Sequence, residues 1–147
     1  MKTCIKTVGI SGSGKSYWAK QYIKDNPNTI EINRDDIRIQ LFKSLYLGEF
    51  SWKEWSWKWE SDVTRLQKTL ILDAALNDKN IILSDTHLTP KNSKDIDLYL
   101  TDLGFNITYN YFDTPIEICI ERDSKRVAPV GESVIRKQYE SFKKLRG

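Results

Sequence analysis

The sequence has no hydrophobic run of the roughly 18–20 residues that a membrane-spanning helix needs. Residues 1–6 also lack the apolar stretch of a secretion signal. The chain has only two cysteines, Cys4 and Cys119, and one histidine, with no spacing typical of metal ligands. These shortages argue against a disulfide framework and against a structural zinc site. Both cysteines fall in apolar runs, so we expect them to be buried. With no disulfide framework, secretion signal or membrane segment expected, the sequence predicts a cytoplasmic protein.

The composition is that of one globular domain. The chain has 147 residues, of which 39% are hydrophobic and 29% are charged. Its formal net charge is +3, a mild excess. That excess is concentrated from residue 122 onward, where eight basic residues stand against three acidic ones. This region is therefore either a solvated helix face or a surface that attracts phosphates.

Short β-rich runs alternate with helical stretches, a pattern typical of an α/β fold with a parallel sheet. We expect strands at residues 4–8, 29–32, 80–84 and 106–112. We expect helices at residues 15–25, 34–47, 57–77, 93–103, about 115–126 and 133–145. Right-handed crossovers place helices on both faces of such a sheet, and ligands bind beyond the carboxyl ends of its strands. Functional residues are therefore expected just after each strand.

The segment after the first strand is Gly-Ile-Ser-Gly-Ser-Gly-Lys-Ser, residues 9–16, which fits the P-loop pattern G-x-x-x-x-G-K-[ST]. A strand before it and a helix after it complete the context of that motif. Backbone N–H groups and the helix N-terminus then surround phosphate oxygens. Lys15 is expected to reach the β- and γ-phosphates of ATP, and Ser16 to ligate Mg²⁺. The motif predicts nucleotide binding and does not identify the acceptor.

A second cluster of polar residues follows the second strand. Asp35 lies just past the strand end, where a carboxylate suits a general base for a hydroxyl acceptor. Arg38 comes three residues later, on a neighbouring helix position, and can hold a substrate phosphate through two hydrogen bonds. The alternative is helix capping by Asn33 or Asp35, with Arg38 paired to a nearby carboxylate.

Two later segments carry further candidates. Asp85 ends the third strand, and it either serves Mg²⁺ or orients Arg38. Arg122 and Arg126 lie four residues apart on the helix after the fourth strand, before a Pro/Gly break at residues 128–131. This spacing predicts a lid whose arginines stabilise the charge of a transferring phosphoryl group. A solvent-facing basic helix is the alternative.

Together these segments resemble the kinase domain of bacteriophage polynucleotide 5′-kinases, in order and spacing along essentially the whole chain. The resemblance rests on residues 9–16, 33–36, 84–86 and 122–126. It implies a P-loop kinase fold with a four-stranded parallel sheet, helices on both faces and an arginine-bearing lid. It also implies transfer of the γ-phosphate of ATP, with Mg²⁺, to 5′-hydroxyl ends of DNA or RNA during end repair.

The resemblance also implies roles for single residues. Asp35 becomes the general base that takes the 5′-hydroxyl proton, with Lys15 and Arg126 as the other catalytic residues. Val130 falls where the family packs an apolar side chain against the terminal base. The implied substrate-binding residues are Arg38, Asp85, Thr86 and Val130. The implied ATP-binding residues are Gly9, Ser11, Gly12, Ser13, Gly14, Lys15, Ser16, Tyr17, Arg122 and Arg126.

The sequence departs from the family at several points. Bifunctional members add a phosphatase domain with a D-x-D-G-T signature, whereas the Asp-Ile-Asp at residues 95–97 lacks the glycine and threonine. We therefore expect a single kinase domain, residues 1–147, without 3′-phosphatase activity. Residues 128–131 differ from the family's lid in order and length. His87, which reads as a general base or as polar surface, stands where the family often has asparagine.

The residues alone are also compatible with two other functions. A small-metabolite or antibiotic kinase shares the P-loop, the strand-end aspartate and the lid arginines. An ATP-binding switch needs the P-loop and no phosphate acceptor. The pairing of Asp35 with Arg38 and the net basic charge favour a polyanionic acceptor over both alternatives.

Residues 50–59 hold four of the five tryptophans. Trp52, Trp55 and Trp59 follow helical spacing, and Trp57 points elsewhere. These aromatic side chains either stack on unpaired bases or pack at a helix corner or a subunit contact.

Overall fold

The structure is a computed structural model that describes residues 2–45 and 48–147, with the side chains of residues 91 and 92 left out. Its elements, in chain order, are β1 (Lys2–Val8), α1 (Lys15–Asp25), β2 (Thr29–Ile32), α2 (Arg34–Leu45), a short 3₁₀ helix η1 (Trp57–Trp59), α3 (Glu60–Leu76), β3 (Asn80–Leu83), α4 (Pro90–Asp102), β4 (Phe105–Tyr111), α5 (Ile116–Ser124) and α6 (Glu132–Arg146). Within these ranges, no helix combines the length and apolar character needed to cross a membrane.

The four strands form one parallel sheet in the order β2-β3-β1-β4. In the register, Cys4 of β1 lies opposite Ile81 of β3 and Ile107 of β4. Because all strands run the same way, their carboxyl ends meet at one edge of the sheet. The predicted four-stranded parallel sheet is therefore confirmed.

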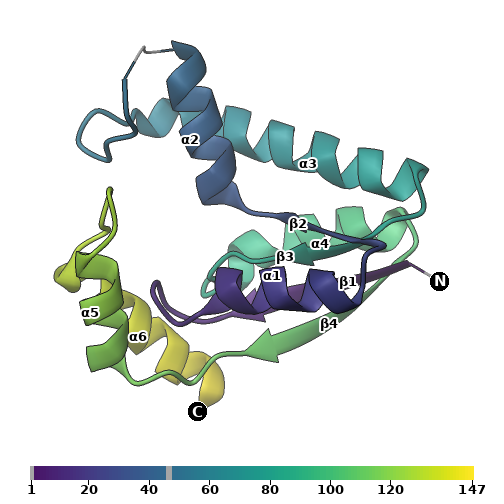
Figure 1. Ribbon diagram of the computed structural model, residues 1–147. Helices are drawn as coiled ribbons and strands as arrows, with labels where there is room; N and C mark the ends of the chain where they lie inside the picture. The colour runs from purple at the N-terminus through teal and green to yellow at the C-terminus, as the bar shows by residue number, and fades with distance from the viewer. Residues whose placement is uncertain (1, 46–47) are drawn as a thin grey trace.

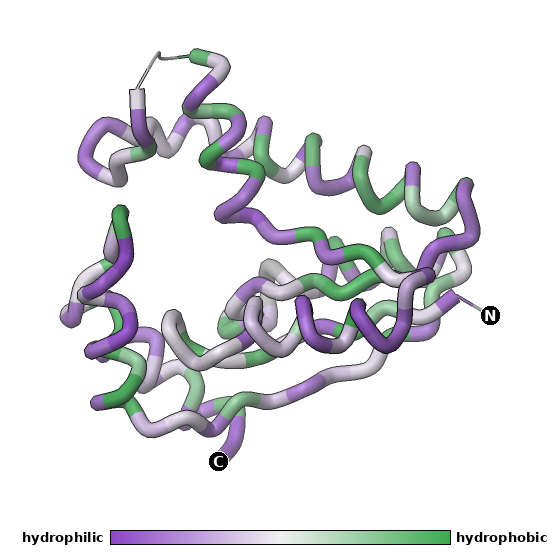
Figure 2. Tube along the Cα trace, viewed as in Figure 1, coloured by the Kyte–Doolittle hydropathy of each residue, from purple (hydrophilic) through white to green (hydrophobic). Residues whose placement is uncertain are grey.

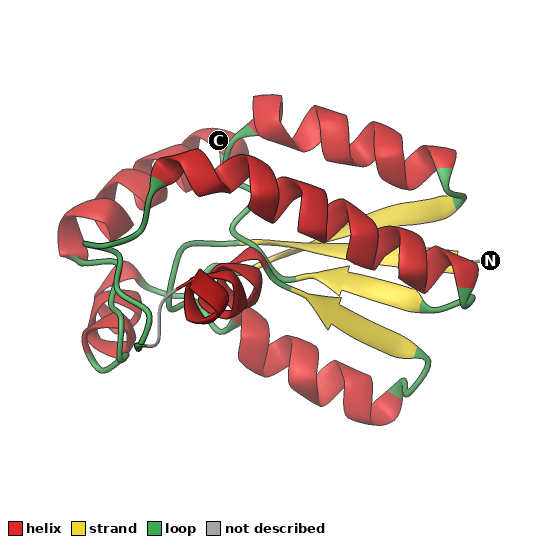
Figure 3. Cartoon of the chain, turned by 90° about the horizontal axis from the view of Figure 1, so that it is seen from above, coloured by secondary structure: helices red, strands yellow, loops and turns green. Residues whose placement is uncertain are grey.

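Helices cover both faces of the sheet (Figures 1 and 3). α1 lies on one face, and α3 and α4 lie on the other. Ile71 of α3 and Leu100 of α4 are fully buried in the same hydrophobic cluster as Ile81 and Leu83 of β3. Figure 2 shows hydrophobic residues concentrated along the central strands, as two-sided burial of a parallel sheet requires. Both cysteines are buried and free, as the sequence predicts.

One partly buried ion pair joins α4 to the sheet. The side chain of Lys6, in the central strand β1, is fully buried. Its Nζ donates to Asp97 Oδ1 at 2.6 Å and to Ser93 Oγ at 2.7 Å, both on α4. Breaking such a pair from one side leaves an uncompensated charge in the core. The pair therefore helps to specify where α4 docks.

The predicted boundaries need small corrections. Strands begin or end within two residues of their predicted bounds, and α1 has its predicted range. α4 begins three residues early, because Pro90 fits the first turn of a helix. Residues 57–59 form a 3₁₀ turn, and the α-helix begins only at Glu60. The predicted end of the helix 34–47 lies outside the described residues, and α2 is described to Leu45.

Candidate active site

The P-loop has the backbone shape that its glycines allow. Gly12 and Gly14 have φ angles of +81° and +98°, in the left-handed region that favours glycine. A Cβ on Gly12 would lie 2.5 Å from the carbonyl oxygen of Cys119, so α5 packs directly on the loop. α1 begins at Lys15, and its free N–H groups and dipole face the same space. The segment is therefore built to accept phosphate oxygens.

Lys15 is held inside this loop. Its Nζ donates to the carbonyl oxygens of Ile10 at 2.7 Å and Gly9 at 3.1 Å. Burial, and then the positive charge of Arg126, lower the pKa of Lys15 to about 8. The Ser16 side chain that follows it is exposed. A cation and a free hydroxyl thus lie at the start of α1.

A cavity of about 810 Å³ opens beyond the carboxyl ends of the strands. It is lined by residues from the P-loop, the start of α2, the tryptophan segment, the end of β3 and the α5–α6 region: Ser11, Gly12, Gly14, Lys15, Ser16, Tyr17, Asn33, Arg34, Asp35, Arg38, Trp52, Trp57, Ser84, Asp85, Thr86, Arg122, Arg126, Val130, Val134 and Gln138. All of the predicted site residues belong to this lining except Gly9 and Ser13. The expectation that functional residues lie beyond the carboxyl ends of the strands therefore led to residues that line one cavity.

Asp35 and Arg38 form an ion pair at the wall of the cavity formed by α2. Asp35 Oδ1 accepts from Arg38 NH1 at 2.7 Å, and half of the Asp35 side chain is exposed. The guanidinium of Arg38 also lies 5.5 Å from the centre of the Trp52 ring, within cation–π range. The carboxylate is thus accessible from the cavity while the arginine is fixed.

Glu60 anchors this pair, and sequence reasoning missed it. Its two carboxylate oxygens accept from Arg38 Nε at 2.9 Å and Arg38 NH2 at 2.8 Å, a two-bond contact. They also accept from Arg34 NH2 at 3.3 Å and from Trp55 Nε1 at 2.9 Å. Burial would raise the pKa of Glu60, but hydrogen bonds and charge from Arg38, together with Arg34, lower it overall. Its position at the start of α3 is a weak sequence signal, because acidic residues are common in the first turn.

Asp85 contacts the start of α2 and the middle of α3, and not Arg38. Its Oδ1 accepts from the backbone N–H of Arg34 at 2.8 Å, and its Oδ2 accepts from Gln67 Nε2 at 3.2 Å. In the described part of the chain, no hydrogen bond or ion pair joins Asp85 to Arg38. Burial raises the pKa of Asp85 to about 6, although the bond from Arg34 opposes that shift. The two oxygens therefore tie α2 and α3 to the end of β3.

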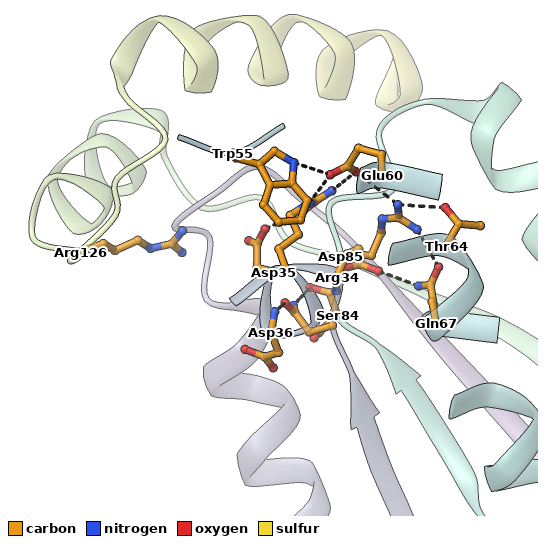
Figure 4. A network of polar contacts seen from close by, with 12 residues as sticks. Arg34, Asp35, Asp36, Trp55, Glu60, Thr64, Gln67, Ser84, Asp85 and Arg126 are labelled. Carbon is orange, nitrogen blue, oxygen red and sulfur yellow. Dashed lines mark hydrogen bonds and ion pairs between the residues drawn. The ribbon is translucent and has the colours of Figure 1, made fainter. Parts of the chain in front are cut away.

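The capping hypothesis is confirmed for Asn33 and not for Asp35. Asn33 Oδ1 accepts from the backbone N–H of Asp36 at 3.1 Å, and its Nδ2 donates to Ser84 Oγ at 3.0 Å. The Asp35 carboxylate pairs with Arg38 and lines the cavity. Asp36 points away from Asp35 (Figure 4) and does not line the cavity.

His87 fits neither of its two sequence interpretations. It has a left-handed φ of +50°, is partly buried, and its Nδ1 lies 2.5 Å from the Thr7 carbonyl oxygen. Burial lowers the pKa of His87 to about 4, so the ring is neutral near pH 7. It does not line the cavity, whereas Thr86 beside it does, and the Thr86 carbonyl accepts from Gly9 N at 3.1 Å. The segment after β3 is thereby joined to the P-loop.

The α5–α6 region brings Arg122 and Arg126 to the cavity. α5 ends at Ser124, so Arg126 follows this helix and does not lie on it as predicted. Arg122 NH1 donates to the Gly12 carbonyl at 3.2 Å. The Arg126 side chain is 44% exposed and points toward Asp35 (Figure 4). The buried Asp123, which the sequence did not single out, accepts from the backbone N–H groups of Val130 at 3.1 Å and Gly131 at 3.0 Å. These two bonds hold Val130 at the cavity wall.

The tryptophans divide into two pairs. Trp55 is buried in the core, and Trp59 packs edge-on against it at 5.1 Å between ring centres. Trp52 and Trp57 lie nearly parallel, with ring centres 6.0 Å apart and planes 20° apart, and both line the cavity. Residues 52–56 are not helical, so the helical spacing predicted for this segment is wrong. Packing explains Trp55 and Trp59 fully and Trp52 in part, since Trp52 also packs against the main core.

Comparison with known proteins identifies the family of the chain. Residues 5–145 match the model of the AAA_33 family, described as an AAA domain. A protein of Autographa californica nuclear polyhedrosis virus, named as a bifunctional polynucleotide kinase/RNA ligase, is 32% identical in an alignment 160 residues long that covers 98% of this chain. The chain spans only 21% of that viral protein.

Several solved structures are similar to the chain. A chain of the Pnkp1/Rnl/Hen1 RNA repair complex matches with a TM-score of 0.78 and 26% identity, over 99% of this chain and 45% of that one. The Deinococcus radiodurans tunicamycin resistance protein (17% identity, TM-score 0.65, 100% of this chain and 82% of that one) shares the fold. The Mycobacterium tuberculosis APS kinase CysC shares it too, with 19% identity and a TM-score of 0.57 over 84% of this chain and 69% of that one. The resemblance to polynucleotide kinases is confirmed, and the chain belongs to the AAA domain family AAA_33 as a kinase-type P-loop protein.

Proposed function

We propose that the protein is an ATP-dependent polynucleotide 5′-hydroxyl kinase that acts in repair of DNA or RNA ends. The observation that carries this proposal is the Asp35–Arg38 pair, 2.7 Å apart, in the wall of the cavity that also contains the P-loop. A carboxylate beside a fixed guanidinium suits an acceptor that has a hydroxyl next to a phosphate. The names of the viral relative and of the repair complex support the same acceptor class.

The donor side of the cavity fits ATP. Gly12 and Gly14 have left-handed φ angles, which let the loop turn its backbone N–H groups toward the space that phosphates would occupy. Lys15, Arg122 and Arg126 would hold the phosphates, and the exposed Ser16 hydroxyl would ligate Mg²⁺. When bound, Mg²⁺-ATP supplies the γ-phosphoryl group and offsets part of its charge.

On the acceptor side, two residues act together. Asp35 accepts the proton of the 5′-hydroxyl while the 5′-oxygen bonds to the γ-phosphorus. The bond between the γ-phosphorus and the leaving ADP oxygen breaks in the same step. Arg38 holds the phosphate 3′ of the first nucleotide, which places the 5′-oxygen near Asp35. Glu60 fixes Arg38 in that position through two hydrogen bonds.

Label transfer from γ-labelled ATP tests the proposal. The protein is incubated with Mg²⁺ and 5′-hydroxyl DNA or RNA oligonucleotides, the same oligonucleotides bearing a 5′-phosphate, or a panel of small alcohols. We expect label only on the 5′-hydroxyl oligonucleotides and none with a Lys15→Ala variant. Transfer to small alcohols alone would identify a small-metabolite kinase. Slow ATP hydrolysis whose rate changes neither on addition of oligonucleotides nor in an Asp35→Ala variant would identify a nucleotide switch.

A further inference from the structure

Trp52 and Trp57 both line the cavity, and the ring of Trp57 has no packing role in the core. Trp57 is 69% exposed and lines the cavity, and its ring is nearly parallel to that of Trp52. Trp52 packs partly against the main core, whereas Trp57 belongs to neither buried cluster. Exposed aromatic surface beside a cavity is typical of a binding site rather than of a core.

The position of this pair relative to Arg38 indicates what it binds. Trp52 meets the Arg38 guanidinium at 5.5 Å, and Trp57 stacks on Trp52. Under the proposed function, Arg38 holds the phosphate that follows the first nucleotide of the acceptor. The next group along the strand from that phosphate is the second nucleotide, whose base is a flat aromatic ring.

We propose that Trp52 and Trp57 form a stacking surface for the unpaired base of the second acceptor nucleotide. This inference rests on the proposed function and deepens it, because it makes the enzyme prefer single-stranded 5′ ends of at least two nucleotides. Stacking tolerates any base, since each has a π-face, so it adds affinity without sequence preference.

The same surface is poorly placed for the base of the donor. Trp52 and Trp57 belong to the segment between α2 and α3, the elements that position Asp35, Arg38 and Glu60. The donor-side residues lie on the P-loop and on the α5–α6 region, which approaches this segment from the opposite side (Figure 1). A base held by Trp57 therefore belongs to the acceptor.

Steady-state kinetics with three acceptors tests this surface. They are a nucleoside 3′-monophosphate, a short 5′-hydroxyl oligonucleotide, and that oligonucleotide with an abasic second position. Trp57→Ala should raise the KM for the intact oligonucleotide about tenfold, leave kcat within about twofold, and leave the KM for the mononucleotide unchanged. Trp57→Phe should retain most of the affinity, because a π-face remains.

The abasic acceptor closes the comparison. Wild type should bind it about as weakly as Trp57→Ala binds the intact strand, and the variant should not distinguish the two. Leu98→Ala, at a 65% exposed apolar side chain of α4 outside the cavity, is the matched control and should behave as wild type. Equal KM values for Trp57→Ala and wild type on the intact oligonucleotide would overturn the inference, as would a rise in the KM for ATP instead.

Binding without catalysis separates this inference from the proposed function. Fluorescence anisotropy of a labelled single strand, with no ATP, should show weaker binding by Trp57→Ala and weaker binding of the abasic strand by wild type. If no acceptor is phosphorylated but this difference appears, the kinase proposal fails and the stacking surface stands. If transfer occurs and Trp57→Ala binds the strand as tightly as wild type, the stacking surface fails alone.

Discussion

Replacing Glu60 by glutamine tests the central claim that one carboxylate holds the acceptor arginine in place. Glu60 accepts two hydrogen bonds from Arg38, one from Arg34 and one from Trp55. Glu60→Gln keeps the size of the side chain and removes its charge. Two guanidinium groups, 15% and 23% exposed, then lose the anion between them. We therefore expect loss of stability together with weaker acceptor binding.

The size of the effect follows from burial. A hydrogen bond to a charged group contributes about 1.5–3 kcal/mol, and Glu60 makes several in a partly buried site. We expect the free energy of unfolding to fall by about 2–4 kcal/mol, which lowers the urea midpoint by roughly 1–2 M. Glu132→Gln is the matched control, because its contact with Arg136 is more than half exposed on both sides. That variant should lose at most about 0.5 kcal/mol.

The pH dependence gives a second readout with a definite sign. Burial acts against the shift, but Arg38 and Arg34 lower the pKa of Glu60 in the folded state. A lowered pKa adds stability above the unfolded value of about 4.3, and this stability is lost as pH falls through the folded value. The gap between wild type and Glu60→Gln should therefore be complete at neutral pH and shrink below about pH 4. A midpoint change under about 0.3 M at neutral pH, or a gap constant down to acid, would refute the reasoning.

Three further substitutions test the site. Asp35→Ala should lower kcat for label transfer by about 10²–10⁴ while ATP affinity, measured by calorimetry, stays unchanged; near-wild-type transfer would remove Asp35 as the base. Arg38→Ala should raise the KM for oligonucleotides about 10–100-fold and affect acceptors without a 3′-phosphate far less, so equal losses on both would contradict its role. Gly12→Ala should weaken ATP binding and lower the melting temperature, because its φ of +81° and the 2.5 Å approach to Cys119 leave no room for a Cβ; an unchanged melting curve would show that the loop tolerates a side chain.

Local sequence signals predicted the parts of the site that depend on one segment. The P-loop pattern gave Lys15 and Ser16 because glycine spacing, a preceding strand and a following helix coincide within a few residues. The i,i+3 spacing predicted that Arg38 meets Asp35, and the structure confirms that contact at 2.7 Å. Parallel strands bring such segments to one edge of the sheet, so the cavity followed from topology.

Tertiary contacts between distant segments could not be predicted in this way. Glu60 meets Arg38 across 22 residues, through a connection whose shape no local pattern specifies. Asp85 had two proposed partners, and the actual donors, the Arg34 backbone and Gln67, became visible only when α2 and α3 were placed. The contact between Trp52 and Trp57 could not be predicted, because a turn and not a helix separates them.

The number of hydrogen bonds still open to Asp35 and Arg38 decides whether they can bind an acceptor without breaking their present contacts. A guanidinium has five N–H donors. Arg38 uses its Nε and one N–H of NH2 on Glu60, and one N–H of NH1 on Asp35. Two N–H groups are left for a phosphate, and Asp35 keeps its second carboxylate oxygen for a hydroxyl proton. A nucleotide with a 5′-hydroxyl and a 3′-phosphate can therefore engage both residues while the bonds to Glu60 stay intact, so the acceptor side needs little reorganisation before transfer.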